Sequence, residues 1–214
     1  MYIPAQFEQP DVELMHELIC NRPFATLVTL GANGIDANHI PLHLEPTPEP
    51  FGVLRGHIAR ANPLWHDLAA DVETLTIFHG PDAYISPSWY ATKQEAGKVV
   101  PTWNYAVVHA YGSLRIIDDA VWVRAQLEAL TQQHEADFPD PWEVSDAPED
   151  FTEKLLGALV GIEMVITRLT GKWKVSQNQP LQNQRSVIQG LNASGQNEAV
   201  AMAALVNDGV KNVG

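Results

Sequence analysis

Cysteine is nearly absent from this chain of 214 residues, because Cys20 is the only one. A single cysteine cannot form an intramolecular disulfide, and it cannot supply the several thiolates of a cysteine-based zinc site. Cys20 falls on the apolar stripe of a helix predicted over residues 11–22, where we expect a buried and inert thiol. These absences leave other side chains to carry any chemistry.

Long apolar runs are also missing. No run approaches the roughly 18 residues of a membrane-spanning helix, and Met1-Tyr2-Ile3-Pro4 does not resemble the start of a signal peptide. We therefore expect a cytoplasmic protein without a membrane partner.

Positive charge is scarce. The chain has 13 Lys and Arg against 26 Asp and Glu, a net charge of −13. Surfaces that bind nucleic acid need clustered Lys and Arg to neutralise phosphates, so the composition makes direct DNA binding doubtful. The sequence also lacks a GxGxxG turn, a Walker loop, an HExxH motif and a GxSxG motif.

The apolar pattern predicts a mainly β fold with peripheral helices. Alternating or β-branched segments predict strands at 24–30, 35–44, 52–58, 72–79, 82–86, 102–117 and 160–173. Helical periodicity predicts helices at 11–22, 62–69, from Asp118 as N-cap, 146–157 with an Asp146–Glu149 capping box, and from Pro180 with breaks at Gly190 and Gly195. Six or more short strands with mostly antiparallel connections indicate a closed or split β-barrel. We divide the chain into a barrel domain over 1–178, with inserted helices over 118–157, and a helical extension over 179–214.

An anion site is predicted where the strand over 52–58 meets the next helix. Arg60 follows the strand, and Asn62 and Pro63 begin the helix. Helix N-termini favour anions, and an arginine adds a bidentate grip on phosphate. The alternative is that Asn62 only caps the helix and Arg60 is solvated.

Two histidines and an aromatic strand entrance form further candidates. His39 and His43 lie on one face of a strand about 13 Å apart, too far to share a metal ion, but such side chains suit the polar edge of a cofactor. Thr102, Trp103 and Asn104 could hydrogen-bond a heterocycle, although aromatic residues there could equally be barrel core.

A basic island interrupts the acidic chain near its C-terminal end. No Asp or Glu occurs between Met164 and Asn197, and this stretch contains Lys172, Trp173 and Lys174. The lysines predict an anionic partner and the indole a flat one, as in a nucleotide-like cofactor. A charged strand edge that deters aggregation is the alternative.

Seven sequence blocks in order resemble the PaiB family of FMN-binding proteins, which are described as negative transcriptional regulators. The blocks are Met1-Tyr-Ile-Pro4 with Phe7, His39-Ile-Pro-Leu42, Gly56-His-Ile-Ala-Arg-Ala-Asn-Pro63, Tyr84-Ile-Ser-Pro-Ser-Trp-Tyr90, Val100-Pro-Thr-Trp-Asn-Tyr105, Val108-His-Ala-Tyr-Gly112 and Gly171-Lys-Trp-Lys-Val-Ser-Gln-Asn178.

The resemblance implies an FMN-binding split barrel, antiparallel and of Greek-key type, similar to pyridoxamine-phosphate oxidase. It implies a homodimer with FMN sites at the subunit interface. The cofactor-binding residues would be His39, Ile40, Pro41, His57, Arg60, Asn62, Thr102, Trp103, Asn104, Trp173, Lys174 and Gln177. The expected function is that of a PaiB-type regulator, acting indirectly since DNA binding is doubtful. The alternative is an FMN-dependent oxidoreductase that acts on a small or flat aromatic substrate.

Overall fold

The computed structural model describes residues 1–69 and 72–211, which form two compact units. The barrel unit contains Val12–Phe78 and His109–Leu169, and the terminal unit contains Met1–Asp11, His79–Val108 and the chain from Thr170 onward. Three long strands, β6 (Thr74–Ile85), β7 (Thr102–Ile117) and β8 (Leu159–Lys174), contribute residues to both units. The predicted division after residue 178 stays a prediction.

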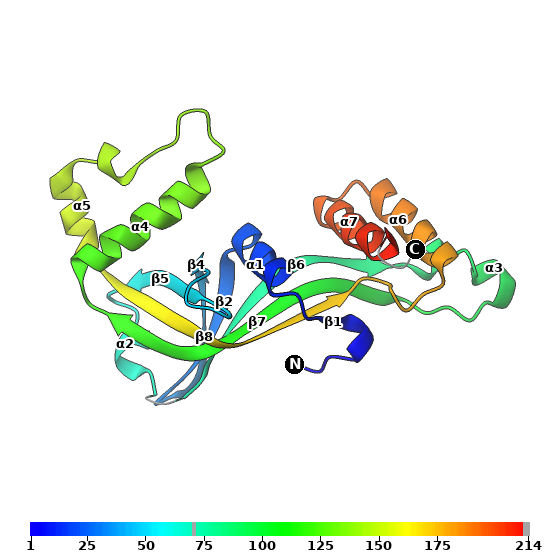
Figure 1. Cartoon of the computed structure of the whole chain (residues 1–214), viewed down its shortest axis with the longest axis horizontal. Coiled ribbons are helices and arrows are strands. Elements are labelled where there is room, and N and C mark those ends of the chain that lie inside the picture. The colour runs from blue at the N-terminus through cyan, green and yellow to red at the C-terminus, as the bar shows by residue number, and fades with distance from the viewer. Residues whose placement is uncertain (70–71, 212–214) are drawn as a thin grey trace. The chain divides into compact units, whose positions relative to one another are not determined.

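An open antiparallel sheet organises the barrel unit (Figure 1). Its other strands are β2 (Phe24–Gly31), β3 (Gly34–Pro41), β4 (His43–Glu45) and β5 (Val53–Ala59), in the order β3-β2-β6-β7-β8-β5-β4. The pairings of β2 with β3 and β6, of β4 with β5, and of β5 with β8 are antiparallel. The sheet has two ends, at β3 and β4, so the barrel is split. The predicted fold class is confirmed.

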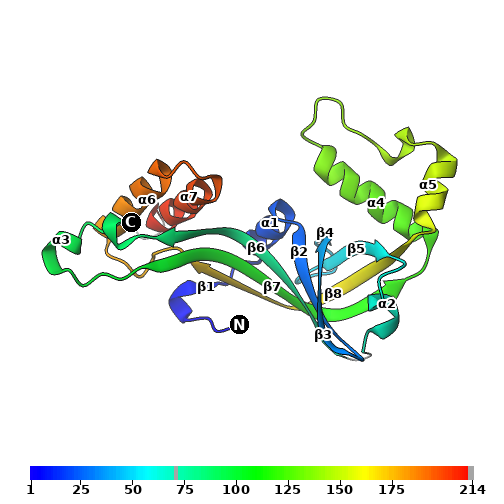
Figure 2. The same ribbon diagram turned by 180° about the vertical axis from the view of Figure 1, so that it is seen from behind.

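Turn chemistry sets the register of the β2–β3 hairpin, which Figure 2 shows from behind. Gly31 pairs with Gly34 across two turn residues, and Gly34 has a φ of 107°, a backbone conformation that residues with a Cβ rarely adopt. From this turn the pairing runs without slippage to Phe24 and Pro41. The register therefore places His39 opposite Thr26.

Helices flank the barrel unit. They are α1 (Val12–Asn21), the short α2 (Leu64–Asp67), α4 (Ala120–Glu135), η3 (Val144–Asp146) and α5 (Glu149–Leu156). Fully buried side chains such as Ile19, Leu27, Leu54, Phe78 and Ile162 make the core. Two predicted caps were wrong. Asp119, rather than Asp118, accepts the first N–H groups of α4, and the capping box that includes Asp146 joins it to Glu143 at η3.

The terminal unit contains η1 (Ala5–Phe7), β1 (Glu8–Gln9), η2 (Pro87–Trp89), α3 (Lys93–Ala96), α6 (Leu181–Ala193) and α7 (Asn197–Lys211). β1 pairs with the end of β8, and α6 and α7 pack side by side (Figure 1). Their core includes Ile85, Val187, Leu191, Met202 and Val206. The predicted helical extension is therefore a helix pair that shares one core with β6 in the terminal unit.

Two local expectations were wrong. The predicted strands at 72–79 and 82–86 are the single strand β6, in which burial alternates on even positions to Gly80 and on odd positions from Ala83. Cys20 is exposed rather than buried, although partial desolvation raises the pKa of its thiol and so disfavours the reactive thiolate.

Among the residues that the structure describes, no helix combines the length and the apolar character needed to cross a membrane.

Gly190 does not end a helix as predicted but lies inside α6 against an indole. A Cβ at this position would lie 2.4 Å from Cδ2 of Trp89, whereas a Cβ on Gly209 of α7 would meet nothing closer than 3.9 Å. We expect Gly190→Ala to lower the free energy of unfolding by about 1–2 kcal/mol, because overpacking outweighs the gain in helix propensity. Gly209→Ala should raise it by up to about 1 kcal/mol. Urea unfolding measures both, and equal stabilisation by the two variants would contradict the packing argument.

Candidate functional site

A pocket between β3 and β5 brings together five of the twelve predicted cofactor-binding residues. This β3–β5 pocket has a volume of about 280 Å³ and lies wholly in the barrel unit. Its lining contains the predicted residues His39, Ile40, Pro41, His57 and Asn62, together with Asn38, Ile58, Ala59 and Leu159. Residues about twenty positions apart in the sequence thus share one concave surface.

Neighbouring side chains orient both imidazoles of this pocket through the same ring nitrogen. Nδ1 of His39 lies 3.2 Å from Oγ1 of Thr26, and Nδ1 of His57 lies 2.8 Å from Oε1 of Gln126. Within the part of the chain that the structure describes, Nε2 of each ring has no hydrogen-bond partner. Each ring can therefore offer Nε2 to a ligand.

Asn62 holds the end of the pocket next to α2. Its Oδ1 accepts the backbone N–H of Leu64 at 3.0 Å, as a cap does, and its Nδ2 donates to Oδ1 of Asn38 at 2.8 Å. The side chain therefore ties the start of α2 to β3.

Gln126 is a site residue that the sequence prediction missed. It is 4% exposed on α4, and its Nε2 has no hydrogen-bond partner among the described residues, although its Oε1 faces His57. The buried positions Val123, Gln126 and Leu130 have helical spacing, so the apolar stripe contains one amide. A glutamine on such a stripe was the available signal.

Arg60 does not line the β3–β5 pocket, because its guanidinium is bound to other groups. It donates to both carboxylate oxygens of Asp118, at 3.1 and 2.5 Å, and to the carbonyl oxygens of Gly157 and Leu159. The hydrogen bond from Arg60 lowers the pKa of Asp118. Four hydrogen bonds leave this side chain one N–H for an outside ligand.

The predicted residues of the terminal unit divide into two sets. Thr102, Asn104 and Lys174 line a second pocket, of about 370 Å³, which reaches the start of α6. We call it the α6 pocket.

The other three residues of that group do not line the α6 pocket. Trp103 is 54% exposed and meets Tyr84 edge to face. Trp173 packs on the core of the terminal unit, and Gln177 bonds the backbone of Val175 and Trp173.

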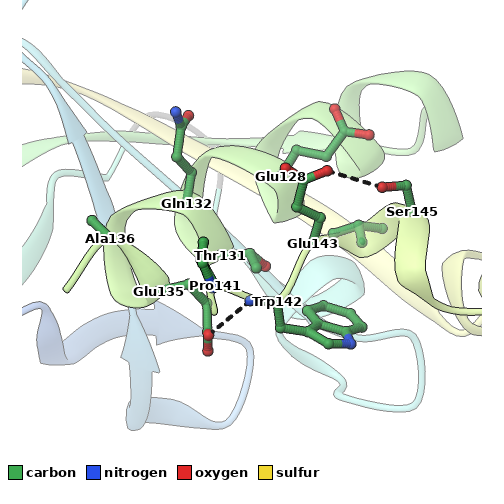
Figure 3. A pocket seen from close by; sticks show the side chains of 10 residues that line it. Glu128, Thr131, Gln132, Glu135, Ala136, Pro141, Trp142, Glu143 and Ser145 are labelled. Carbon is green, nitrogen blue, oxygen red and sulfur yellow. Dashed lines mark hydrogen bonds between the residues drawn. The ribbon is translucent and has the colours of Figure 1, made fainter. Parts of the chain in front are cut away.

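A third pocket, of about 520 Å³, lies between α4 and η3 and contains no predicted residue (Figure 3). Glu128, Glu135 and Glu143 contribute to its lining. Glu135 accepts the backbone N–H of Trp142, and Glu143 accepts the hydroxyl of Ser145. Three carboxylates make this pocket unsuitable for an anionic cofactor.

Comparison with known proteins identifies the ligand class. Residues 1–168 match the family described as "Putative FMN-binding domain". An uncharacterized protein of Emericella nidulans is 34% identical over 244 residues, which cover 97% of each chain. The protease synthase and sporulation protein PAI 2 of Bacillus subtilis is 29% identical over 211 residues, which cover 99% of each, so the resemblance to the PaiB family is confirmed.

The fold is also that of known flavoproteins. The FAD and heme binding protein of Mycobacterium smegmatis superimposes with a TM-score of 0.58 over 78% of this chain and 73% of that one, at 16% sequence identity. At this identity the likeness concerns the fold alone. On its sequence match across residues 1–168, the chain belongs to the FMN-binding domain family, and its cofactor is FMN.

Proposed function

We propose that FMN is held at the β3–β5 pocket of a homodimer, and that the chain acts as an FMN-binding regulator of the PaiB type. The observation that carries the proposal is the convergence of His39, His57 and Asn62 on one pocket, with the unpartnered Nε2 of Gln126 behind His57.

The polar groups of this pocket fit the chemistry of FMN. Oε1 of Gln126 can only accept, so Nδ1 of His57 donates to it, and in a neutral imidazole Nε2 is then an acceptor for a ribityl hydroxyl or the flavin ring N–H. The amide groups near the pocket can donate to phosphate oxygens, flavin carbonyls and ring nitrogens of the cofactor. Gln126 fixes the ring of His57 and His39 is fixed by Thr26, so neither imidazole must be ordered when the ligand binds. Ile40, which is 5% exposed, supplies an apolar wall. Bound FMN would supply the redox chemistry, while these residues bind and orient it.

The size of the pocket supports a dimer. Pockets that enclose a small molecule usually measure about 300–1,000 Å³, and the β3–β5 pocket has about 280 Å³ for a cofactor with three fused rings and a phosphorylated side chain. Part of FMN would therefore contact a second subunit. Trp173, Lys174 and Gln177 stay predicted contacts from that subunit, and Thr102, Trp103 and Asn104 stay predicted contacts of the flavin ring.

A regulatory role rests on the B. subtilis relative, whose name refers to protease synthesis and sporulation. The net charge of −13 opposes contact with the phosphate backbone of DNA. We therefore infer that regulation is indirect, through a protein or metabolite partner that responds to the flavin.

An FMN-dependent oxidoreductase is the second candidate, and the α6 pocket favours it because a second cavity could hold a substrate. Anaerobic addition of NADPH separates the two candidates. Bleaching of the bound flavin followed by turnover with an acceptor supports the enzyme, whereas flavin that stays oxidised with NADPH and with NADH counts against it.

Removal of the His57 imidazole tests the location of the flavin. We expect His57→Ala to weaken FMN binding by about 1 kcal/mol, about fivefold, through loss of one hydrogen bond. Quenching of flavin fluorescence during titration measures the affinity. His134→Ala, which changes an exposed histidine of α4 outside every described pocket, is the matched control. Equal FMN affinities of the two variants would show that FMN does not bind at this pocket.

Paired variants of Arg60 and Asp118 test whether Arg60 contacts the phosphate. If Arg60 mainly fastens α4, Arg60→Ala and Asp118→Ala should lower the melting temperature alike, and the double variant should lose little more. FMN affinity should change little. A loss of FMN affinity in Arg60→Ala that Asp118→Ala does not share would instead identify a phosphate contact.

The same ion pair predicts an acid-sensitive step in stability. The pKa of Asp118 is lower in the folded chain than its usual value near 4, so its contribution is present above that value and is lost as the pH falls through the lowered pKa. Asp118→Asn should therefore flatten the fall of stability with pH at the acid end, measured by thermal unfolding. An unchanged slope would mean that the pair contributes nothing.

Dimer formation is the remaining test of the proposal. Sedimentation velocity with saturating FMN should give a species of twice the chain mass. A monomer that binds FMN with full affinity would contradict the shared site.

A further inference from the structure

The α6 pocket concentrates positive charge in an acidic chain. Its lining contains Lys98 and Lys174 and no Asp or Glu, although acids outnumber bases two to one in the sequence. All of its lining residues lie in the terminal unit. It is therefore a complete cavity that needs no other part of the chain.

A helix N-terminus adds to this charge. Gln179, Pro180 and Asn183 line the pocket at the start of α6, a helix of 13 residues. The N-cap position is Pro180, and no side chain caps the helix there. The first backbone N–H groups of a helix have no partner within it and carry the positive end of the helix dipole, so they attract an anion.

Asn104 supplies an independent sign of a ligand. It lines the pocket, it is 1% exposed, and its Oδ1 has no hydrogen-bond partner among the residues that the structure describes. A buried acceptor of this kind costs free energy unless a donor reaches it. A ligand that carries an N–H or O–H group would satisfy this acceptor.

The turn after β8 fixes the orientation of that acceptor. Nδ2 of Asn104 donates to Oγ of Ser176 at 2.8 Å. Ser176 is buried and has a φ of 64°, in the left-handed region that residues with a Cβ seldom adopt. Gln177 holds this turn by bonding the backbone of Val175 and Trp173. The amide of Asn104 is therefore positioned before any ligand arrives.

Lys174 is placed to receive an anion. Its Nζ donates to Oγ1 of Thr102 and to the carbonyl oxygen of Trp103, which leaves its third N–H available. Burial and, secondarily, the charge of Lys172 lower the pKa of Lys174. An anion in the pocket would offset both effects.

We propose that the α6 pocket is a binding site for a small organic acid that carries a hydrogen-bond donor, and that it is distinct from the FMN site. The acid group lies toward Lys98, Lys174 and the start of α6, and the donor reaches Oδ1 of Asn104. The volume of about 370 Å³ suits a molecule of this class, and Val99 and Val100 supply apolar walls for its body. Thr102, Asn104 and Lys174, which the sequence predicted as flavin contacts, are reassigned to the acid by this proposal, whereas the residues of the β3–β5 pocket keep their proposed FMN role. The inference therefore goes beyond the proposed FMN function.

Calorimetric titration of the full chain with 4-hydroxybenzoate tests the proposal, with glycolate as a smaller hydroxy acid. We expect at least one of them to bind, and its donor-free counterpart, benzoate or acetate, to bind about fivefold more weakly because Oδ1 of Asn104 stays unpaired. The absence of any heat from both hydroxy acids at millimolar concentration would overturn the proposal. Equal affinity for the donor-free counterpart would show that Oδ1 of Asn104 does not accept a hydrogen bond from the acid.

Charge variants locate the bound acid. Lys98→Gln should weaken binding about threefold to tenfold, whereas Lys93→Gln, which removes an exposed lysine outside the pocket, should have no effect. Asn104→Asp should weaken it by about tenfold or more through repulsion between like charges. Equal effects of Lys98→Gln and Lys93→Gln would show that the acid responds only to net charge.

A competition experiment separates this site from the FMN site. The same titration at saturating FMN should give an unchanged affinity for the acid. Displacement of the acid by FMN would overturn the proposal, since the pocket would then be part of the flavin site of a partner subunit. A chain that binds the acid but not FMN would contradict the proposed FMN site and leave the acid site standing.

Discussion

The register between β5 and β8 is the constraint on which the barrel unit depends. The antiparallel pairing sets Arg55 opposite Glu163 and His57 opposite Gly161. A Cβ on Gly161 would lie 2.5 Å from Cζ3 of Trp122, so only glycine lets this indole of α4 lie directly against β8. A slip of one residue would put a side chain there and turn His57 to the other face of the sheet.

Close packing of α4 then orients a histidine of the β3–β5 pocket. Gln126 follows Trp122 by about one helical turn, and its Oε1 reaches Nδ1 of His57 at 2.8 Å. Arg60, just beyond the end of β5, holds Asp118 immediately before the same helix. Arg60 thus fastens the start of α4, and Gln126 in the second turn of α4 orients the imidazole of His57. The chemistry of His57 is therefore tied to the stability of the barrel unit.

Acidic and basic side chains line different pockets of this acidic chain. The pocket between α4 and η3 presents the carboxylates of Glu128, Glu135 and Glu143, whereas the α6 pocket presents two lysines and no carboxylate. The one buried carboxylate of the sheet, Glu163, accepts from both Arg55 and Arg115. This distribution favours anions at the α6 pocket over the pocket between α4 and η3.

Periodicity and turn residues determined the β-rich class, the hairpin at Gly31–Gly34, most strand and helix positions, and the sequence blocks that identify the family. These are local properties, written in adjacent residues. The tertiary structure alone decided which candidates share a pocket. In the folded chain Arg60 binds Asp118, and Trp173 packs against the core of the terminal unit. Gln126 forms a hydrogen bond with His57, and Asn104 forms one with Ser176. A guanidinium, an indole or an amide can serve a ligand or the protein equally well, and only neighbours distant in the sequence decide between the two.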